Sequence, residues 1–212
     1  YWINQVDFSS SAEPSYKSSN HEFLKAVDVS AKSSARRIRK AWSDYETNVD
    51  YGIVPMDLPK VASCIDAGLE TQLYHVSFRN NAFDTHVQQP NLHRRLLSYA
   101  SDAIFGFVND LKRLGHADRV VVMVYSEFGR RVPENANLGT DHGSANNMFF
   151  IGNRVNGGHY GVLPSLVNLI DSGNLAFTTD FRQVYATAIE DWLKVDSKKV
   201  LKGTFERFPI FA

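Results

Sequence analysis

The sequence has a single cysteine, no long apolar run and no net charge, and each shortage excludes a class of protein. One thiol, Cys64, cannot form an internal disulfide framework or a zinc site built from several cysteines. No apolar stretch reaches the length that a bilayer-spanning helix needs. The 23 Lys and Arg residues balance the 23 Asp and Glu residues, so the net charge gives no overall electrostatic attraction to nucleic acid or to an anionic membrane. We therefore expect charge to act only locally.

What the sequence does contain is enough hydrophobic material for a core, since 43% of its 212 residues are hydrophobic. Residues 1–20 differ, because they are rich in serine, and we expect them to form a surface segment or linker. Residues 21–212 are expected to form one domain. The chain begins at Tyr1 with no initiator Met and no basic-then-apolar leader, so we interpret it as a fragment or a processed product.

Four segments show the apolar spacing of helices, and they cover residues 24–45, 58–69, 92–114 and 179–193. Gly68 and Gly115 are the predicted stops of the second and third segments, and Thr179 or Asp180 is the predicted cap of the last. Cys64 falls inside the second segment, where we expect a buried structural thiol. The basic run from Arg36 to Lys40 in the first segment is interpreted as a solvated helix face.

Three segments have the composition of strands. They are residues 72–78, which are followed by the turn-prone residues 79–81, the apolar run 120–125, and residues 148–151. The order strand, helix, strand predicts a right-handed βαβ unit with two parallel strands. The expected fold is therefore α/β, with a mostly parallel sheet and helices on both of its faces.

Polar loops adjoin all three predicted strands. Ligands of such sheets bind outside the carboxyl ends of parallel strands, and an antiparallel third strand would bring its own loop to the same edge. The candidate metal ligands in these loops are Asp84, His86, Glu127, Asp141 and His142. Oxygen and imidazole donors without cysteine suit zinc, manganese, iron or a related divalent ion.

Some of these candidate ligands also fit a purely structural role. The Asp84-Thr85-His86 sequence fits a capped turn, because Asp side chains bind nearby backbone N–H groups. Glu127 fits equally well as the partner of Arg130 or Arg131 in an ion pair. The remaining histidines have no comparable context and are interpreted as surface or core residues: His21, His75, His93, His116 and His159.

Several motifs in a fixed order resemble the bacterial family called domain of unknown function 1501. They are VVMVYSEFGR at 121–130, GTDHG at 139–143 and FFIG at 149–152, with FDTH at 83–86, GGHYG at 157–161 and TDFRQVYA at 179–186 in support. The resemblance extends from about residue 51 to the C-terminus. It also implies membership of the alkaline-phosphatase-like, or sulfatase-like, superfamily and an alkaline-phosphatase-like fold.

Members of that superfamily use a two-metal site, commonly zinc, and a Ser or Thr nucleophile to transfer phosphate or sulfate esters. By resemblance, Asp84 and His86 are the ligands that precede the long helix, His142 is the later single His ligand, and Asp141 is an additional ligand. Ser126-Glu127 stands where the superfamily has an Asp-His pair, so the carboxylate remains and the imidazole is missing. The resemblance places the nucleophile upstream of Tyr1, and the chain then corresponds to the C-terminal half of its parent.

Two functions follow as expectations. The first is a metal-dependent hydrolase of phosphate or sulfate esters, or its metal-binding portion, with zinc as the expected ion and manganese or calcium as alternatives. Its substrate would be a small anionic ester that pairs with Arg130 or Arg131. The second is a non-catalytic exported or envelope protein that keeps the fold without the chemistry. The resemblance implies a periplasmic or secreted location, and the zero net charge disfavours a nucleic-acid binder built on residues 36–40.

Overall fold

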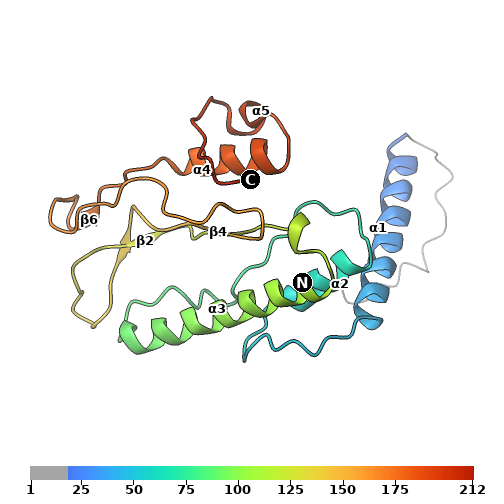
Figure 1. The fold of residues 1–212 in the computed structure, drawn as a ribbon, viewed down its shortest axis with the longest axis horizontal. Coiled ribbons are helices and arrows are strands. Elements are labelled where there is room, and N and C mark those ends of the chain that lie inside the picture. The colour runs from blue at the N-terminus through green and yellow to red at the C-terminus, as the bar shows by residue number, and fades with distance from the viewer. Residues whose placement is uncertain (1–18) are drawn as a thin grey trace. The chain divides into compact units, whose positions relative to one another are not determined.

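The computed structural model describes residues 19–212 and divides the chain into two units, residues 1–45 and 46–212 (Figure 1). The first unit contains helix α1 (Ser19–Ser43), which confirms the helix predicted there. Its surface carries the ion pairs Asp28 to Lys32 and Lys40 to Asp44, one helical turn apart, and the basic run 36–40 is exposed as expected. Of the predicted serine-rich segment, residues 1–18 lie outside the described part of the chain.

Two of the predicted helices build the core of the second unit. Helix α2 (Leu58–Asp66) packs on α3 (Gln89–Arg113), and Ala62, Ala103 and Phe107 are among their buried apolar residues. Both helices are followed by a glycine with a left-handed backbone, Gly68 at φ 67° and Gly115 at φ 77°, as the sequence predicts.

A buried polar contact and a buried thiol complete this core. The carboxylate of Asp110 on α3 accepts hydrogen bonds from the Tyr51 hydroxyl, at 2.7 Å, and from Arg113 Nε, at 2.8 Å, so its charge is paired. The Cys64 thiol is buried and free, and its burial raises its pKa. Cys64 is thus the structural residue that the sequence predicts.

All strand pairs in the described residues are antiparallel and only two or three residues long. Strand β1 (Val122–Val124) pairs with β4 (Phe149–Ile151), with Met123 opposite Phe150. Strand β2 (Gly129–Arg130) pairs with β3 (His142–Gly143), and β5 (Leu169–Ile170) pairs with β6 (Asn174–Leu175). These three ladders form three separate two-stranded sheets.

The predicted mostly parallel sheet with helices on both faces, and with it the alkaline-phosphatase-like fold, is therefore wrong for this structure. The strand predicted over residues 72–78 is not formed, although burial alternates along this segment, with Tyr74, Val76 and Phe78 half-buried between exposed neighbours. Without that strand the described residues contain no βαβ unit, and β1 pairs with β4 in antiparallel orientation. An apolar run shows that a strand is shielded from water, but it does not specify which segment pairs with it.

The C-terminal part of the chain is helical, as predicted. A short 3₁₀ turn (Ala117–Arg119) links α3 to β1, and α4 (Phe181–Thr187) continues into a π-helical turn (Ala188–Trp192) before α5 (Ser197–Leu201). Asp180 caps α4 by accepting a hydrogen bond from the backbone N–H of Arg182 at 2.9 Å, so the predicted cap is confirmed. Among the helices of residues 19–212, none combines the length and the apolar character required to cross a membrane.

Candidate metal centre

The loop that carries Asp84 and His86 is held down by the residue between them. Thr85 is only 4% exposed, and its hydroxyl lies 3.0 Å from Gln89 Nε2 and 3.1 Å from His93 Nδ1, both on α3. Gln89 Nε2 also donates to the carbonyl oxygen of Thr85 at 3.1 Å. Because Thr85 is buried while Asp84 is exposed and His86 half-buried, the anchoring leaves both flanking side chains accessible.

The second loop, with Asp141 and His142, is positioned by the short β2–β3 pair. His142 stands opposite Arg130 in the ladder, and the backbone N–H of Arg131 donates to the carbonyl oxygen of Asp141 at 3.0 Å. The Arg130 guanidinium donates to the carbonyl oxygen of Thr140 at 2.7 Å and to that of Phe83 at 2.5 Å. Arg130 thus ties together the residues that immediately precede the two candidate ligand pairs.

Glycines let the two loops approach each other closely. A Cβ atom at Gly139 would lie 2.2 Å from the carbonyl oxygen of His86, and one at Gly143 would lie 2.5 Å from the carbonyl carbon of Arg130. Any larger residue at either position would collide with backbone that is already fixed. Gly139 therefore serves the close packing of the two loops, and Gly143 serves the close packing of β3 against β2.

Three of the predicted ligands converge on one point. Oδ1 of Asp84 lies 2.9 Å from Nε2 of His86 and 2.6 Å from Nε2 of His142, and the two Nε2 atoms are 3.1 Å apart. Asp84 and His142 are 58 residues apart in the sequence. Within the described part of the chain, these three residues are the group that could hold a metal ion.

The donor set and its geometry fit a divalent ion. Tetrahedral zinc with ligands at about 2.0–2.1 Å places its donor atoms roughly 3.3 Å apart. The two Nε2 atoms, 3.1 Å apart, are already close to that separation, and the shortest pair, Asp84 Oδ1 and His142 Nε2 at 2.6 Å, would have to open by about 0.7 Å. Two imidazoles and one carboxylate also match the three protein ligands of open zinc sites, which leave a coordination position for water or substrate. The cluster offers one such site, and residues 19–212 contain no second group of three or more His, Cys, Asp or Glu donors this close together.

Asp141 faces the ring nitrogen of His86 that does not take part in the cluster. Its Oδ1 is 3.4 Å from Nδ1 of His86, on the ring edge away from the cluster, and it accepts a hydrogen bond from Asn135 Nδ2 at 3.2 Å. A carboxylate in this place fixes the orientation of a ligating imidazole. The structure therefore places Asp141 as a partner of His86, whereas the sequence interpretation made it a ligand.

The carboxylates of the centre are held in their charged form. The hydrogen bond with His142 lowers the pKa of Asp84, and the bond from His86 acts in the same direction. The hydrogen bond from Asn135 lowers the pKa of Asp141. Below the site, burial and then the Arg130 charge lower the pKa of His93, which favours the neutral imidazole beside Thr85.

Glu127 does not join the cluster. It is exposed, and within residues 19–212 it forms no ion pair with Arg130 or Arg131, so the alternative of a structural ion pair is not realised either. The hydroxyl of its neighbour Ser126 donates to the carbonyl oxygen of Phe128 at 3.0 Å. Arg131 places a buried Nε with no hydrogen-bond partner in the described structure close to Asp141.

The sequence interpretation missed the residues that support the site. Phe128 stacks on the His142 ring with the centroids 3.7 Å apart and 12° between the planes, and Asn135 binds both the carbonyl oxygen of His86 and the carboxylate of Asp141. Asn135 Oδ1 also accepts from the N–H groups of Asn137 and Gly139. An asparagine shortly before a glycine is a turn signal, but nothing in the sequence shows that its amide reaches another loop.

Comparison with protein families gives one positive finding. The model of a family described as "Protein of unknown function (DUF1501)" matches residues 7–205, which is almost the whole chain. No curated protein and no solved structure matches the chain.

Proposed function

The chain belongs to the DUF1501 family of proteins of unknown function, and we propose that it forms the metal-binding part of a hydrolase of phosphate or sulfate esters. The proposed ligands are Asp84, His86 and His142, and zinc is the proposed ion, with manganese or calcium as alternatives. The relation to the alkaline-phosphatase-like superfamily is part of this proposal. It rests on the ligand residues and their order in the sequence.

One observation carries the proposal: two imidazole Nε2 atoms and a carboxylate oxygen from two distant loops meet within 3.1 Å. The three side chains are 38–45% exposed, so burial does not force these polar atoms together. If both Nε2 atoms carried hydrogens, their N–H groups would repel each other at 3.1 Å. A shared cation removes that conflict, because each atom can then present a lone pair.

The side chains around the ligands have distinct roles in this proposal. A divalent ion bound here would supply a Lewis acid for an ester oxygen. Asp141 orients His86 through Nδ1, and Phe128 fixes the plane of the His142 ring. Arg130 supports the loops through two carbonyl groups, and the Nε of Arg131 is buried, so these atoms are not open to an anionic substrate.

A non-catalytic metal-binding protein is the second candidate, and the hydroxyl groups near the site favour it. Thr85 is buried and its hydroxyl contacts Gln89 and His93, while Ser126 is bound to a backbone carbonyl. Neither hydroxyl is arranged as a nucleophile. The hydrolase proposal therefore includes a nucleophile upstream of Tyr1 and an exported, periplasmic or secreted parent, as the resemblance implies.

Metal content tests the proposal first. The purified protein is expected to hold about one zinc per chain by elemental analysis, and His86→Ala and His142→Ala are each expected to lose it. His159→Ala is the matched control, because His159 is exposed and outside the cluster. Stoichiometric metal in both ligand variants would refute the assignment.

Activity then separates the two candidates. The full-length parent is expected to hydrolyse p-nitrophenyl phosphate or p-nitrophenyl sulfate and to lose this activity with a chelator. Zinc binding with no turnover of either ester would instead favour the non-catalytic protein.

A further inference from the structure

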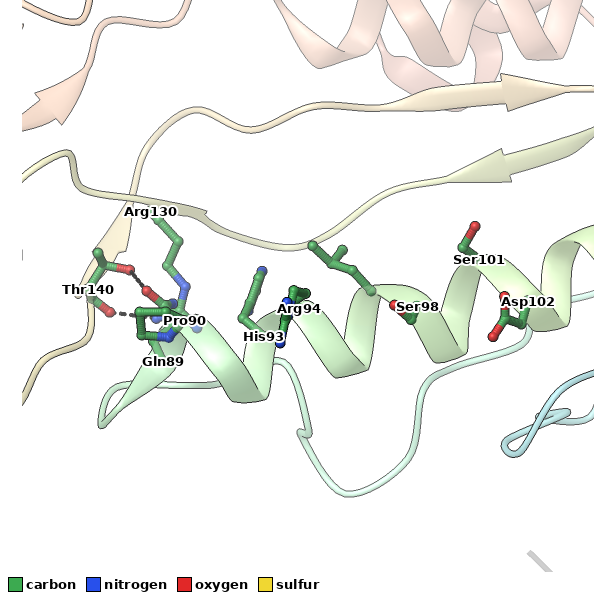
Figure 2. Close-up of a pocket in the computed structure, with 10 residues that line it drawn as sticks. Gln89, Pro90, His93, Arg94, Ser98, Ser101, Asp102, Arg130 and Thr140 are labelled. Carbon is green, nitrogen blue, oxygen red and sulfur yellow. Dashed lines mark hydrogen bonds between the residues drawn. The ribbon is translucent and has the colours of Figure 1, made fainter.

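An open groove of about 690 Å³ runs along α3, and Figure 2 shows the residues that line it. One wall is the helix itself from Gln89 to Asp102, which at 1.5 Å per residue is roughly 20 Å long. Arg130 and Thr140 line the end near the metal centre, and Asp102 lies at the far end. Thr140 directly precedes Asp141, and Arg130 binds the carbonyl group before Asp84, so the groove begins at the scaffold of the proposed ligands.

The groove contains one positively charged side chain that the described residues do not engage. Arg94 is exposed and, within residues 19–212, forms no hydrogen bond or ion pair. Arg130 also lines the groove, but its guanidinium is directed at protein carbonyl groups. A guanidinium that is not engaged elsewhere is the side chain best suited to bind a phosphate or sulfate group through two parallel hydrogen bonds.

Beyond Arg94 the helix presents a stripe of neutral hydrogen-bonding groups. Ser98 and Ser101 follow Arg94 at helical spacing, and Leu97 leaves 54% of its surface exposed among them. Asp102 ends the stripe with a carboxylate, which repels a second anionic group and accepts hydrogen bonds from hydroxyls. A ligand that fits this order has an anionic group at the metal end and hydroxyl groups beyond it.

We propose that this groove binds a saccharide that carries a sulfate or phosphate ester, with the ester group on Arg94 and sugar hydroxyls on Ser98, Ser101 and Asp102. Leu97 would lie against the apolar face of a sugar ring. Phe, Tyr and Trp are all missing from the lining, and its one aromatic ring, His93, is engaged with Thr85 and packs edge-on against Phe83, so a nucleic acid that binds by base stacking fits less well. The wall is a helix whose backbone groups bond internally, so it offers an extended peptide no strand to pair with.

This inference rests on the proposed function only for the hydrolysis of the ester, and binding of the sugar to the groove does not require it. The test therefore measures binding to the protein without metal. Titration calorimetry with the chelator-treated protein would compare three probes: a glucan tetrasaccharide with one sulfate, the same tetrasaccharide with one phosphate, and the unmodified tetrasaccharide. At least one ester form is expected to bind at least tenfold more tightly than the unmodified sugar. The stronger ester identifies the natural anionic group.

Variants on α3 locate the site. Arg94→Ala is expected to weaken binding of the preferred ester about five- to tenfold, the loss of one exposed charge-assisted contact. Arg95→Ala is the matched control, because Arg95 is the next residue, is also exposed and does not line the groove. The double variant Ser98→Ala, Ser101→Ala is expected to weaken binding of both the ester and the unmodified sugar.

Three results would overturn the proposal. They are equal effects of Arg94→Ala and Arg95→Ala, inorganic sulfate or phosphate binding as tightly as the ester sugar, and loss of binding when the α1 residues Arg36 and Arg37 are changed to Gln. The last result would assign the anion to the basic face of α1. Sugar binding is expected to be unchanged in His142→Ala, the variant that is expected to lose the metal. Binding to the groove and metal binding can therefore fail independently of each other.

Discussion

Replacing Arg130 with lysine keeps the positive charge but removes the fork that binds two carbonyl groups at once. The guanidinium donates to the Thr140 carbonyl at 2.7 Å and the Phe83 carbonyl at 2.5 Å, with a longer contact of 3.4 Å to the Thr85 hydroxyl. A lysine ammonium carries its donors on one nitrogen, so it lacks the two separate nitrogens, Nη1 and Nη2, with which Arg130 binds the two carbonyls.

The expected cost follows from the bonds lost. One charge-assisted hydrogen bond contributes about 1.5–3 kcal/mol, and the contacts here are half-buried, so Arg130→Lys is expected to lower the free energy of unfolding by roughly 2 kcal/mol. For a unit of this size that corresponds to a fall in melting temperature of roughly 4–8 °C. Zinc affinity is expected to fall as well, because Arg130 joins the residues that precede both ligand loops.

Urea unfolding and zinc titration measure the two effects, and Arg94→Lys is the matched control. Arg94 is exposed and without a partner in the described structure, so its replacement is expected to change the free energy of unfolding by less than about 0.5 kcal/mol. If Arg130→Lys were as stable as the control and bound zinc equally well, the account of Arg130 as the link between the loops would be refuted.

Three further predictions concern packing, pH and thiol chemistry. Gly139→Ala is expected to destabilise the protein and weaken zinc binding, because its Cβ would lie 2.2 Å from the His86 carbonyl oxygen, whereas Gly157→Ala, at a position with open space, should do neither. The hydrogen bonds from the Arg182 side chain and backbone lower the pKa of Asp180 in the folded protein. The charged carboxylate therefore stabilises the folded state at pH values above the unfolded pKa of about 3.9. This contribution disappears as the pH falls through the folded pKa. Urea unfolding is therefore expected to show a stability difference between wild type and Asp180→Asn that is constant above about pH 5 and shrinks below about pH 4; a constant difference down to pH 2 would contradict it. Cys64 is buried with a raised pKa, so it is expected to react with a chromogenic disulfide reagent at pH 8 only after unfolding, and rapid reaction of the native protein would disagree with the structure.

Local signals in the sequence predicted the helices well, because helix spacing and glycine stops act over a few residues. Gly68, Gly115 and the Asp180 cap all have their predicted roles. The sheet could not be predicted in this way, because strand pairing depends on distant segments. Residues 72–78 alternate in burial as a strand should, yet they form no strand, and β1 pairs with β4 in antiparallel orientation.

The sequence predicted three of the residues that form the candidate site. It did not predict the contacts that bring them together. Asp84, His86 and His142 were expected at the edge of a parallel sheet that does not exist. They converge because Arg130 bridges the loops, Gly139 lets them touch, and β2 and β3 set the register. Glu127 follows β1 at an exposed bend, where it is outside the cluster and, within residues 19–212, forms no ion pair with an arginine; its sequence position gave no sign of this.

X-ray absorption at the zinc edge tests the central claim most directly, because it reports the ligands of the bound ion. The spectrum of the zinc-loaded protein is expected to show nitrogen and oxygen donors at about 2.0–2.1 Å, no sulfur, and the outer-shell signature of two imidazoles. The imidazole count should fall to one in His142→Ala and remain two in Glu127→Ala. Two imidazoles retained in His142→Ala, or a sulfur ligand in the wild type, would contradict the proposed metal centre.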